Sequence, residues 1–520
     1  MPRRSSTFEL PLPPRDRRVH AYRWLYTALR DSILQGRLHP GSRLPSTRDL
    51  AIQYEVSRGT VVLAFEELKS EGYLESITGS GTRVSRVLPE DLLHAHSQAA
   101  RYSTSKPPSA ADLRRNTGGA APPKQRHLSA FARRAAPFEH YEKRVSRPFR
   151  PNLPALDLFP ADLWARTTVR RVRKASVQDL FFCDPMGFMP LRLAVAEYLT
   201  TSRGVNCQPE QIAIVSGVQE ALDLTARLLA GPGDRVGVED PGYPGAALAF
   251  EAVGAHLVPL EVDDGGWKLD WRRLKDVRLL YVTPGHQFPL GITMSLPRRL
   301  QVLEWATRTG ATIFEDDYDS EYRYEGRPVP ALQSLDSEGA VLFAGSFSKV
   351  LFPSLRMGYA VIPADLVDRF AAAKSISTRH APMLEQMILS DFMEAGHFAR
   401  HLRRMRQIYS ERRAALVETA KTHWSGLLEI SGVEAGLQTA ARLCEGMDPE
   451  AAAMAAAERG IEVVPINRYS RQRKASSALQ LGFAPFAPRE IRHGVRELAL
   501  ALEPLRKITH NNRSAAFSRR

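Results

Sequence analysis

The sequence lacks long apolar runs. No run of about 18 hydrophobic residues, the length that a membrane-spanning helix requires, occurs, although hydrophobic residues make up 43% of the 520-residue chain. The basic start, MPRRSSTFELPLPPRDRR, also lacks the apolar segment of a secretory signal. These absences argue against a membrane protein and against export, and they predict a cytoplasmic location.

Cysteine is scarce as well. Cys183, Cys207 and Cys444 lie far apart, without the spacing of a zinc site or of a redox pair. We therefore expect reduced thiols in a cytoplasmic protein, and no metal site.

Positive charge is concentrated at one end of the chain. Residues 1–150 contain 26 Lys and Arg against 14 Asp and Glu, whereas the remaining residues contain 45 against 43. Such a basic segment can neutralise phosphates and attract nucleic acid. An arginine-rich solubilising segment would have the same charge, so the assignment also needs a motif.

Changes in composition and in apolar periodicity divide the chain into four segments. Periodic apolar patterns predict a first domain at residues 19–86. Residues 87–148, with SKPPSA and NTGGAAPPK, carry little apolar periodicity and are predicted to form a flexible linker. A large domain is expected at 149–508, followed by a loose basic tail at 509–520.

In the large domain, short β-branched runs alternate with helical patterns. The strand-like runs are 211–215, 235–238, 279–282, 312–314 and 341–344, and the clearest helical patterns are 220–229 and 297–309. Nearly continuous apolar strands separated by helices are typical of the α/β class, with a mostly parallel sheet covered on both faces.

The first domain contains three helical patterns. They cover about 21–35, 47–54 after the N-cap Ser46, and 58–71 after the N-cap Ser57. The short turn between the second and the third predicts a helix-turn-helix. Two short strands around Gly-Ser-Gly at 79–81 then predict a β-wing.

The segment LPSTRDLAIQYEVSRGTVVLAFEELKSEGYLESITGSGTRV closely resembles the winged helix of GntR-type regulators. The resemblance implies double-stranded operator DNA as a partner, with the third helix in the major groove. It implies DNA contacts by Arg48, Ser57, Arg58, Thr60 and Gly81. The alternative is a helical protein-interaction module whose arginines are merely solvated.

The sharpest chemical signal is Gly-Ser-Phe-Ser-Lys at 345–349, followed by Arg356. A turn of small residues after the 341–344 strand would hold Lys349 at the carboxyl edge of the sheet, where α/β proteins bind ligands. The hydroxyls of Ser346 and Ser348 and the guanidinium of Arg356 would suit a phosphate.

Polar and aromatic side chains follow other predicted strands. They are Asp316 and Tyr318, Tyr243, the pair His286 and Gln287, and the backbone amides of Val218 and Gln219. A lysine amine, a phosphate clamp, an aromatic ring and a carboxylate together predict a pyridoxal 5′-phosphate site. Each residue alone has an ordinary explanation as core, helix cap or surface charge.

From Pro151 to Leu505 the chain resembles fold-type I aminotransferases. PGHQFPLGITMSLPRR, EDDYDSEYRYEGRP and FSKVLFPSLRMGY resemble the effector domain of MocR-type regulators, which join this domain to a GntR-type winged helix. The resemblance implies a large domain with a smaller C-terminal α+β subdomain, and a homodimer.

The resemblance also implies a role for each site residue. Lys349 would form a Schiff base with the cofactor, Asp316 would keep the pyridine nitrogen protonated, and Tyr243 would stack on the ring. Tyr318, helped by His286 or Gln287, would contact the ring 3′-oxygen. The phosphate would be held by Ser346, Ser348, Arg356 and the amides of Val218 and Gln219.

Two positions depart from the family pattern. Phe182 stands where a tyrosine usually reaches the cofactor phosphate of the partner subunit, and Gln480 stands where many aminotransferases have a carboxylate-binding arginine. Arg468 is a candidate for binding an acidic group of an effector, although an exposed loop arginine is the simpler interpretation. These departures argue against efficient transamination.

The sequence therefore predicts a transcription regulator that senses a small amine, an amino acid or pyridoxal phosphate itself. One alternative is a working aminotransferase with an accessory DNA-binding domain. Another is a DNA-binding protein that uses the aminotransferase fold only as a dimerisation scaffold.

Overall fold

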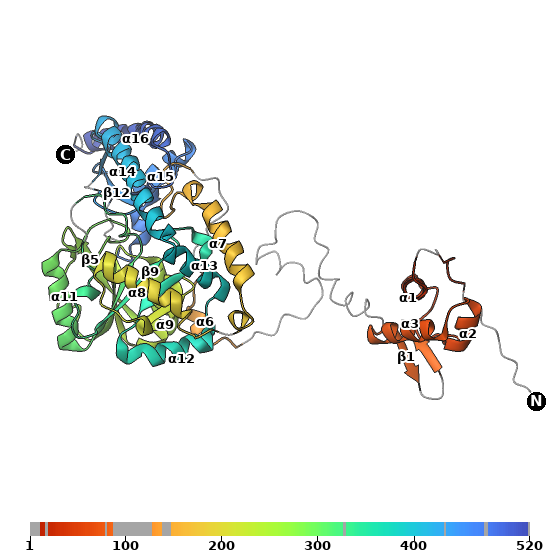
Figure 1. Cartoon of the computed structure of the whole chain (residues 1–520). Helices are drawn as coiled ribbons and strands as arrows, with labels where there is room; N and C mark the ends of the chain where they lie inside the picture. Colours follow the sequence, from red (N-terminus) through yellow and green to blue (C-terminus); the bar gives the residue numbers. More distant parts are fainter. Residues whose placement is uncertain are drawn as a thin grey trace, which may run out of the picture. The chain divides into compact units, whose positions relative to one another are not determined.

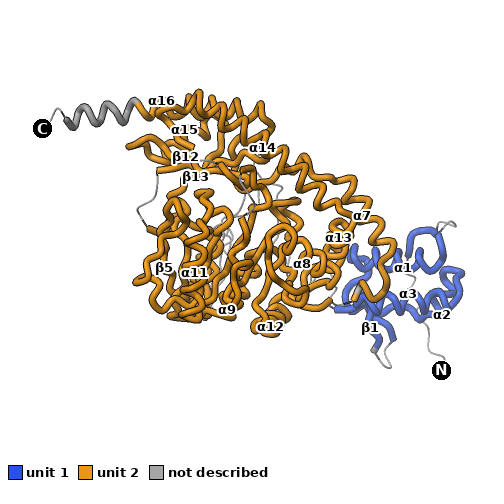
Figure 2. Tube along the Cα trace, turned by 60° about the vertical axis from the view of Figure 1, so that its left-hand side comes forward, with its two compact units in different colours: residues 1–125 blue, residues 126–520 orange. Residues whose placement is uncertain are grey.

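A computed structural model of the chain describes residues 11–15, 19–77, 81–86, 127–137, 147–181, 183–325, 329–430, 433–472 and 477–517. Residues 1–125 and 126–520 form two compact units (Figure 2). Most of the predicted linker lies outside the described residues. Within the described ranges, no helix is both long and apolar enough to cross a membrane.

The first unit is a small helical domain with a two-stranded sheet (Figure 1). Its elements are α1 (Ala21–Leu34), α2 (Thr47–Gln53), α3 (Arg58–Ser70), β1 (Leu74–Ile77) and β2 (Gly81–Val84), and the two strands are antiparallel. The predicted helices and strands of the winged helix are therefore confirmed, with ends that differ by one residue or two.

Side-chain caps and one apolar cluster explain this local fold. The Ser46 hydroxyl accepts a hydrogen bond from the Asp49 amide at 3.2 Å, and the Ser57 hydroxyl accepts one from the Thr60 amide at 3.0 Å. Each cap satisfies an amide that has no acceptor within its helix. The core includes Leu25, Leu29, Ile33, Leu50, Val61, Ala64, Phe65, Leu68 and Val84.

The second unit is built on an eight-stranded sheet. Its strands are β3 (Ile212–Val215), β4 (Arg235–Asp240), β5 (His256–Asp263), β6 (Gly266–Trp267), β7 (Val277–Val282), β8 (Thr312–Asp317), β9 (Val341–Ser346) and β10 (Gly358–Val361). They lie in the order β3-β10-β9-β8-β7-β4-β5-β6. The pairs from β5 through β4, β7 and β8 to β9 are parallel, whereas β10 and β6 are antiparallel to their neighbours.

Helices cover both faces of this sheet. They are α6 (Ala130–Arg134), α7 (Ala161–Lys174), α8 (Met189–Arg203), α9 (Val218–Leu229), α10 (Pro244–Val253), α11 (Leu296–Thr309), α12 (Val367–Ser377) and α13 (Met383–Glu394). Alternate residues of β3 point to opposite faces. Ala213 and Val215 pack with α9, α10 and α12, whereas Ile212 and Ile214 pack with α8 and α13. The predicted mostly parallel α/β sheet is confirmed.

A smaller subdomain follows, as predicted. Its elements are α14 (His397–His423), β11 (Leu428–Ile430), β12 (Gln438–Leu443), α15 (Pro449–Glu458), β13 (Val464–Pro465), β14 (Ala478–Gly482) and α16 (Pro488–Phe517). The four strands are antiparallel, in the order β11-β12-β14-β13. Short 3-10 turns lie at Leu156–Leu158, Gln178–Leu180, Pro209–Gln211, Gln333–Leu335, Pro353–Leu355, Ala364–Leu366 and Ile466–Tyr469.

The end of the chain differs from the prediction. The loose tail expected at 509–520 is wrong for the backbone through Phe517, because α16 continues to that residue. Once a helix exists, each added residue gains one backbone hydrogen bond. Residues 505–517 contain no glycine or proline that would end it.

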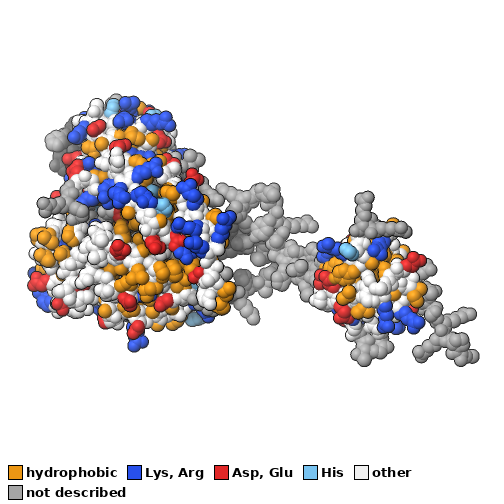
Figure 3. Space-filling model, viewed as in Figure 1, with side chains coloured by type: hydrophobic (Ala, Val, Ile, Leu, Met, Phe, Trp, Pro, Cys, Tyr) orange, Lys and Arg blue, Asp and Glu red, His pale blue; other side chains and the backbone are white. Residues whose placement is uncertain are grey.

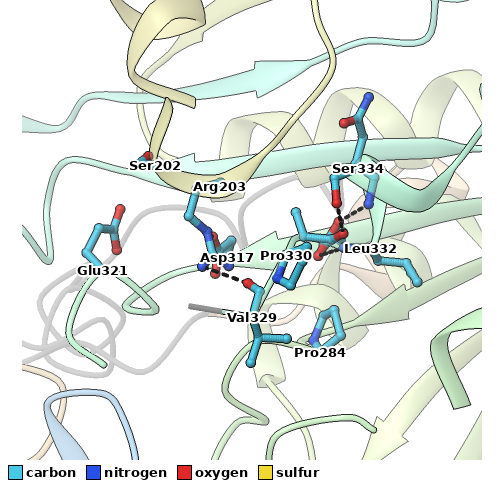
Figure 4. A network of polar contacts seen from close by, with 12 residues as sticks. Ser202, Arg203, Pro284, Asp317, Glu321, Val329, Pro330, Leu332 and Ser334 are labelled. Carbon is cyan, nitrogen blue, oxygen red and sulfur yellow. Dashed lines mark hydrogen bonds and ion pairs between the residues drawn. The ribbon is translucent and has the colours of Figure 1, made fainter. Parts of the chain in front are cut away.

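A buried ion pair joins α8 to the end of β8 (Figure 4). Arg203 Nε lies 2.8 Å from Asp317 Oδ2, and the two side chains are only 7% and 5% exposed. A second nitrogen of Arg203 donates to the Val329 carbonyl at 3.2 Å. Removing the arginine would leave the Asp317 carboxylate buried without its counter-ion.

We expect Arg203→Met to lower the free energy of unfolding by about 3–5 kcal/mol, because the substitution leaves the Asp317 carboxylate buried without a counter-ion. The measurement is urea unfolding of the cofactor-free protein. Arg278→Met is the matched control, since Arg278 is 66% exposed in its pair with Asp234. This variant should lower the free energy of unfolding by less than about 1 kcal/mol. Equal losses in the two variants would contradict the assignment.

Candidate functional site

Several strand ends meet at one edge of the sheet. β8 ends at Asp317, β9 ends at Ser346 and β10 begins at Gly358. Asp316 is paired with Ala344, and Ser346 with Gly358. The sequence predicted that Asp316 and Ser346 follow their strands; both lie instead in the last residues of longer strands, where the sheet ladder fixes them.

Lys349 lies three residues beyond β9 and is partly buried. Its Nζ donates a hydrogen bond to the Asn152 carbonyl at 2.7 Å. Burial lowers the pKa of this amine to about 8, although the carboxylates of Asp319 and Asp316 act in the opposite direction. A sizeable neutral fraction near physiological pH makes the amine a better nucleophile than an exposed lysine.

The Asp316 carboxyl group has one occupied and one free oxygen. Oδ2 accepts a hydrogen bond from the Tyr281 hydroxyl at 2.8 Å. Oδ1 is buried, and no group in the described part of the chain donates to it. Burial raises the pKa of Asp316 to about 7, opposed by the Tyr281 bond. A buried acceptor without a donor is suited to a protonated ring nitrogen, which fits pyridoxal phosphate.

The start of α9 and Arg356 form a candidate phosphate cradle. Gly217, at φ 111°, precedes the helix, whose first amides lack intrahelical acceptors. A Cβ atom on Gly217 would lie 3.5 Å from Arg356 Nη2, so the guanidinium lies directly beside this helix end. Amides of Val218 and Gln219 together with an arginine are suited to a phosphate dianion.

The two predicted serines lie in the same turn. The Ser346 hydroxyl accepts a hydrogen bond from the Ser348 amide at 3.1 Å. This bond folds the chain back just before Lys349 and leaves the Ser346 hydroxyl proton available for an acceptor such as a phosphate oxygen.

A cluster of aromatic rings lies near these groups. Tyr243, which precedes α10, lies 5.8 Å from Phe288 and 6.5 Å from Tyr281 between ring centroids. Tyr318 also packs edge-on against Phe288, at 6.0 Å. The structure therefore brings Tyr243 and Tyr318 to the same ring cluster, while their contacts with a cofactor stay a prediction.

The neighbouring side chains of His286 and Gln287 contact different residues. His286 Nδ1 lies 3.0 Å from the Tyr318 hydroxyl and 2.8 Å from Asp319 Oδ1. Gln287 Nε2 instead donates to Glu239 Oε2 and to two backbone carbonyls. These bonds hold the Gln287 amide at Glu239, so of the two predicted helpers only His286 contacts Tyr318.

Sequence reasoning missed several residues of this site. Tyr281 was hidden in an apolar strand run, and Asn152 lies far from Lys349 in the chain. Asp319 pairs with His286 and stands only three residues after Asp316. The acidic run EDDYD was visible in the sequence, but which of its carboxylates would face the lysine depends on the strand register.

Two further predictions concerned the effector end of the site. Arg468 is 54% exposed and ion-pairs with Glu450 at 2.6 Å, so binding an effector would require this pair to open. This favours the simpler interpretation of a surface arginine. Gln480 is fully buried on β14. Phe182 lies outside the described residues.

In the first unit, the predicted DNA-contacting residues are accessible. Arg48, Arg58 and Gly81 are exposed, and the Ser57 hydroxyl lies 2.7 Å from the Thr60 hydroxyl while it caps α3. Sequence reasoning missed Arg43: a Cβ atom on Gly81 would lie 3.4 Å from its Nε, so this guanidinium covers the wing glycine.

Comparison with known proteins gives the same two parts. The family "Bacterial regulatory proteins, gntR family" matches residues 21–84, and "Aminotransferase class I and II" matches 159–498. The probable rhizopine catabolism regulatory protein MocR of Rhizobium meliloti is 40% identical, over 94% of this chain and 96% of its own. The chain belongs to the MocR-type family of transcription regulators. The regulator TauR of Rhodobacter capsulatus, 30% identical over 91% of this chain and 94% of its own, is similar over the same two parts.

The MocR-type effector domain is also similar to solved aminotransferases. LysN, an α-aminoadipate aminotransferase from Thermus thermophilus complexed with N-(5′-phosphopyridoxyl)-L-leucine, is 30% identical. It covers 69% of this chain and 93% of its own, with a TM-score of 0.64. The family match and this structure support pyridoxal 5′-phosphate as the cofactor, in agreement with the unpaired Asp316 oxygen.

The raised pKa of Asp316 gives a test by pH. In the unfolded chain the Asp316 carboxyl has a pKa near 3.8. In the folded protein without cofactor its pKa is about 7. Between these values the folded protein retains a proton that the unfolded chain has released, so this contribution to stability is present below pH 4 and is lost as the pH rises through 7.

We therefore expect the unfolding free energy of the cofactor-free protein, relative to Asp316→Asn, to fall between pH 5 and pH 7, by up to about 1.4 kcal/mol per pH unit. Above pH 8 the difference should be constant. Urea unfolding at four pH values measures it. A difference that does not vary with pH would contradict the assigned protonation.

Proposed function

We propose that this chain acts in the cytoplasm as a homodimeric, pyridoxal-phosphate-dependent regulator. Its winged helices bind operator DNA, and the Lys349 site senses a small amine, an amino acid or the cofactor itself. The observation that carries this proposal is the buried, unpaired oxygen of Asp316, close to a lysine amine of lowered pKa, in a chain that also carries a GntR-type winged helix.

When bound, pyridoxal phosphate supplies an aldehyde that reacts with amines and a ring that withdraws electrons. Lys349 provides the amine for that aldehyde. Asp316 Oδ1 would accept a hydrogen bond from the protonated ring nitrogen and keep it protonated, and Tyr318, supported by His286, would donate to the 3′-oxygen. Tyr243 would stack on the ring. The phosphate would be held by Ser346, Ser348, Arg356 and the amides of Val218 and Gln219.

At the other end of the chain, α3 enters the major groove. Arg48 and Arg58 contact phosphates or base edges, Ser57 and Thr60 bind a phosphate at the start of α3, and Gly81 lets the wing approach the minor groove. Lys and Arg side chains on the face of this unit drawn in Figure 3 support an electrostatic contribution to DNA binding.

The two sites are coupled through the dimer. Effector binding at Lys349 favours one of two arrangements of the paired effector domains, and each arrangement sets the positions of the two winged helices on their half-sites. Because this coupling is a difference in binding free energy, operator DNA must change the affinity for the effector by the same factor.

A working aminotransferase is the second candidate. The 30% identity with LysN supports it, whereas Gln480 in place of an arginine argues against it. Incubation of the cofactor-loaded protein with amino acids and a keto acid separates the two: many turnovers per site without a change in DNA affinity favour the enzyme. A pure dimerisation scaffold would bind no cofactor.

We expect Lys349→Ala to abolish the absorbance band of the lysine-bound cofactor and the adduct that borohydride traps, because the substitution removes the amine assigned to the cofactor aldehyde. Lys275→Ala is the control, since Lys275 is exposed and away from the strand edge. Absorption spectra and mass spectrometry of the reduced protein measure the result. An unchanged adduct in Lys349→Ala would remove the sensor proposal and leave the scaffold alternative.

We expect Arg58→Ala to weaken operator binding about tenfold or more, because a base or phosphate contact is lost, while the cofactor spectrum stays the same. Arg496→Ala removes the same charge from an exposed position in the other unit and should change neither. Fluorescence anisotropy with labelled operator DNA is the measurement. Concurrent loss of DNA and cofactor binding would contradict separate roles for the two units.

A further inference from the structure

Gln480 carries an unused hydrogen-bond donor in the interior of the small subdomain. Its side chain is fully buried on β14, and its Oε1 accepts a hydrogen bond from the Tyr469 hydroxyl at 2.9 Å. Its Nε2 has no acceptor among the residues that the structure describes. Buried amide donors are nearly always paired, so this one calls for a partner from outside the chain.

Gln438 presents a second amide on the same face of this sheet. Ala440 is paired with Gln480 and Gln438 with Gly482, which makes the two glutamines diagonal neighbours on one face. Gln438 is 2% exposed. Its Nε2 has no acceptor of full hydrogen-bond geometry within the described ranges, but the side chain acts as a hydrogen-bond donor toward the Tyr318 hydroxyl, where it opposes the rise in pKa that burial causes.

Both amides connect to the candidate cofactor site. Gln438 Oε1 accepts a hydrogen bond from the Asn152 amide at 2.8 Å, and the Asn152 carbonyl accepts one from Lys349 Nζ. On the other side, the Tyr469 ring lies 5.0 Å from Phe288, the ring that packs against Tyr318. Gln438 is thus linked to Lys349 through Asn152, and Gln480 is linked to Tyr318 through Tyr469 and Phe288.

No buried arginine of the described residues is hydrogen-bonded to Gln480 or Gln438. The buried arginines are Arg192, Arg203, Arg299 and Arg412. They donate to backbone carbonyls or, in the case of Arg203, also to Asp317. A carboxylate placed beside Gln480 would thus be buried without a counter-charge, which is costly.

We propose that Gln480 and Gln438 form the specificity subsite of this regulator and select an uncharged, hydroxyl-bearing amine over an amino acid. The amide nitrogens donate to hydroxyl oxygens of the effector. This inference rests on the proposed function, since it identifies the chemical class sensed at Lys349.

The test compares two probes that differ in one group. Serinol (2-amino-1,3-propanediol) carries a hydroxymethyl group where L-serine carries a carboxylate. With the full-length, cofactor-loaded protein, calorimetry and operator-DNA anisotropy should both give serinol an apparent affinity at least tenfold higher than that of serine. Equal or tighter binding of serine would overturn the proposal.

Two variants identify the residue responsible. Gln480→Glu keeps the shape and the acceptor for Tyr469 but removes the donor, and should weaken serinol binding about tenfold or more. Gln480→Arg supplies a counter-ion and should reverse the preference in favour of serine. If the arginine variant does not fold, the isosteric variant decides, with cofactor absorbance as the check on folding. An unchanged serinol affinity in Gln480→Glu would also overturn the proposal.

Gln211→Glu is the matched control. Both amide atoms of Gln211 are used, in bonds to the Ile362 carbonyl and from the Gln208 amide, and the residue precedes β3 at the opposite end of that strand from the site. It should leave both affinities unchanged. If no amine or amino acid alters either the cofactor spectrum or DNA binding, the proposed function itself fails; if amino acids do so and serinol does not, only the subsite proposal fails.

Discussion

The meeting of several strand ends at one edge of the sheet is the constraint on which the rest of this molecule depends. Parallel strands bring their carboxyl ends together, so residues far apart in the chain become neighbours there. Asp316 and Ser346 occupy the last positions of β8 and β9, and Lys349 follows in the next turn. The α9 helix begins at the same edge, so a phosphate and a ring nitrogen can be bound at one place.

Burial at this edge gives the site its chemistry. Removal from water lowers the pKa of the Lys349 amine and raises that of the Asp316 carboxyl. Both shifts favour the neutral form of the group. Because water is excluded here, a ligand can supply the hydrogen bonds that solvent does not. The same burial makes unpaired amides such as Gln480 costly, and so links the small subdomain to the identity of the effector.

Much of the fold was predictable because its signals are local. Periodicity located α1, α2 and α3 within a residue or two, and the capping serines marked where α2 and α3 begin. Side-chain direction was less predictable. Gln287 follows His286 directly, yet its amide bonds to Glu239, and Arg468 pairs with Glu450. Such partners come from distant parts of the chain, and no local pattern contains them.

The sequence by itself determined the fold class, the winged helix and the cofactor, and it predicted the lysine that would bind this cofactor, because each depends on residue types at short spacing. Only the tertiary structure decided which oxygen of Asp316 is free, that Tyr281 and Asn152 contact the site, and that Gln438 shares a sheet face with Gln480. These features depend on the register between strands and on burial, which are set by packing across the whole domain.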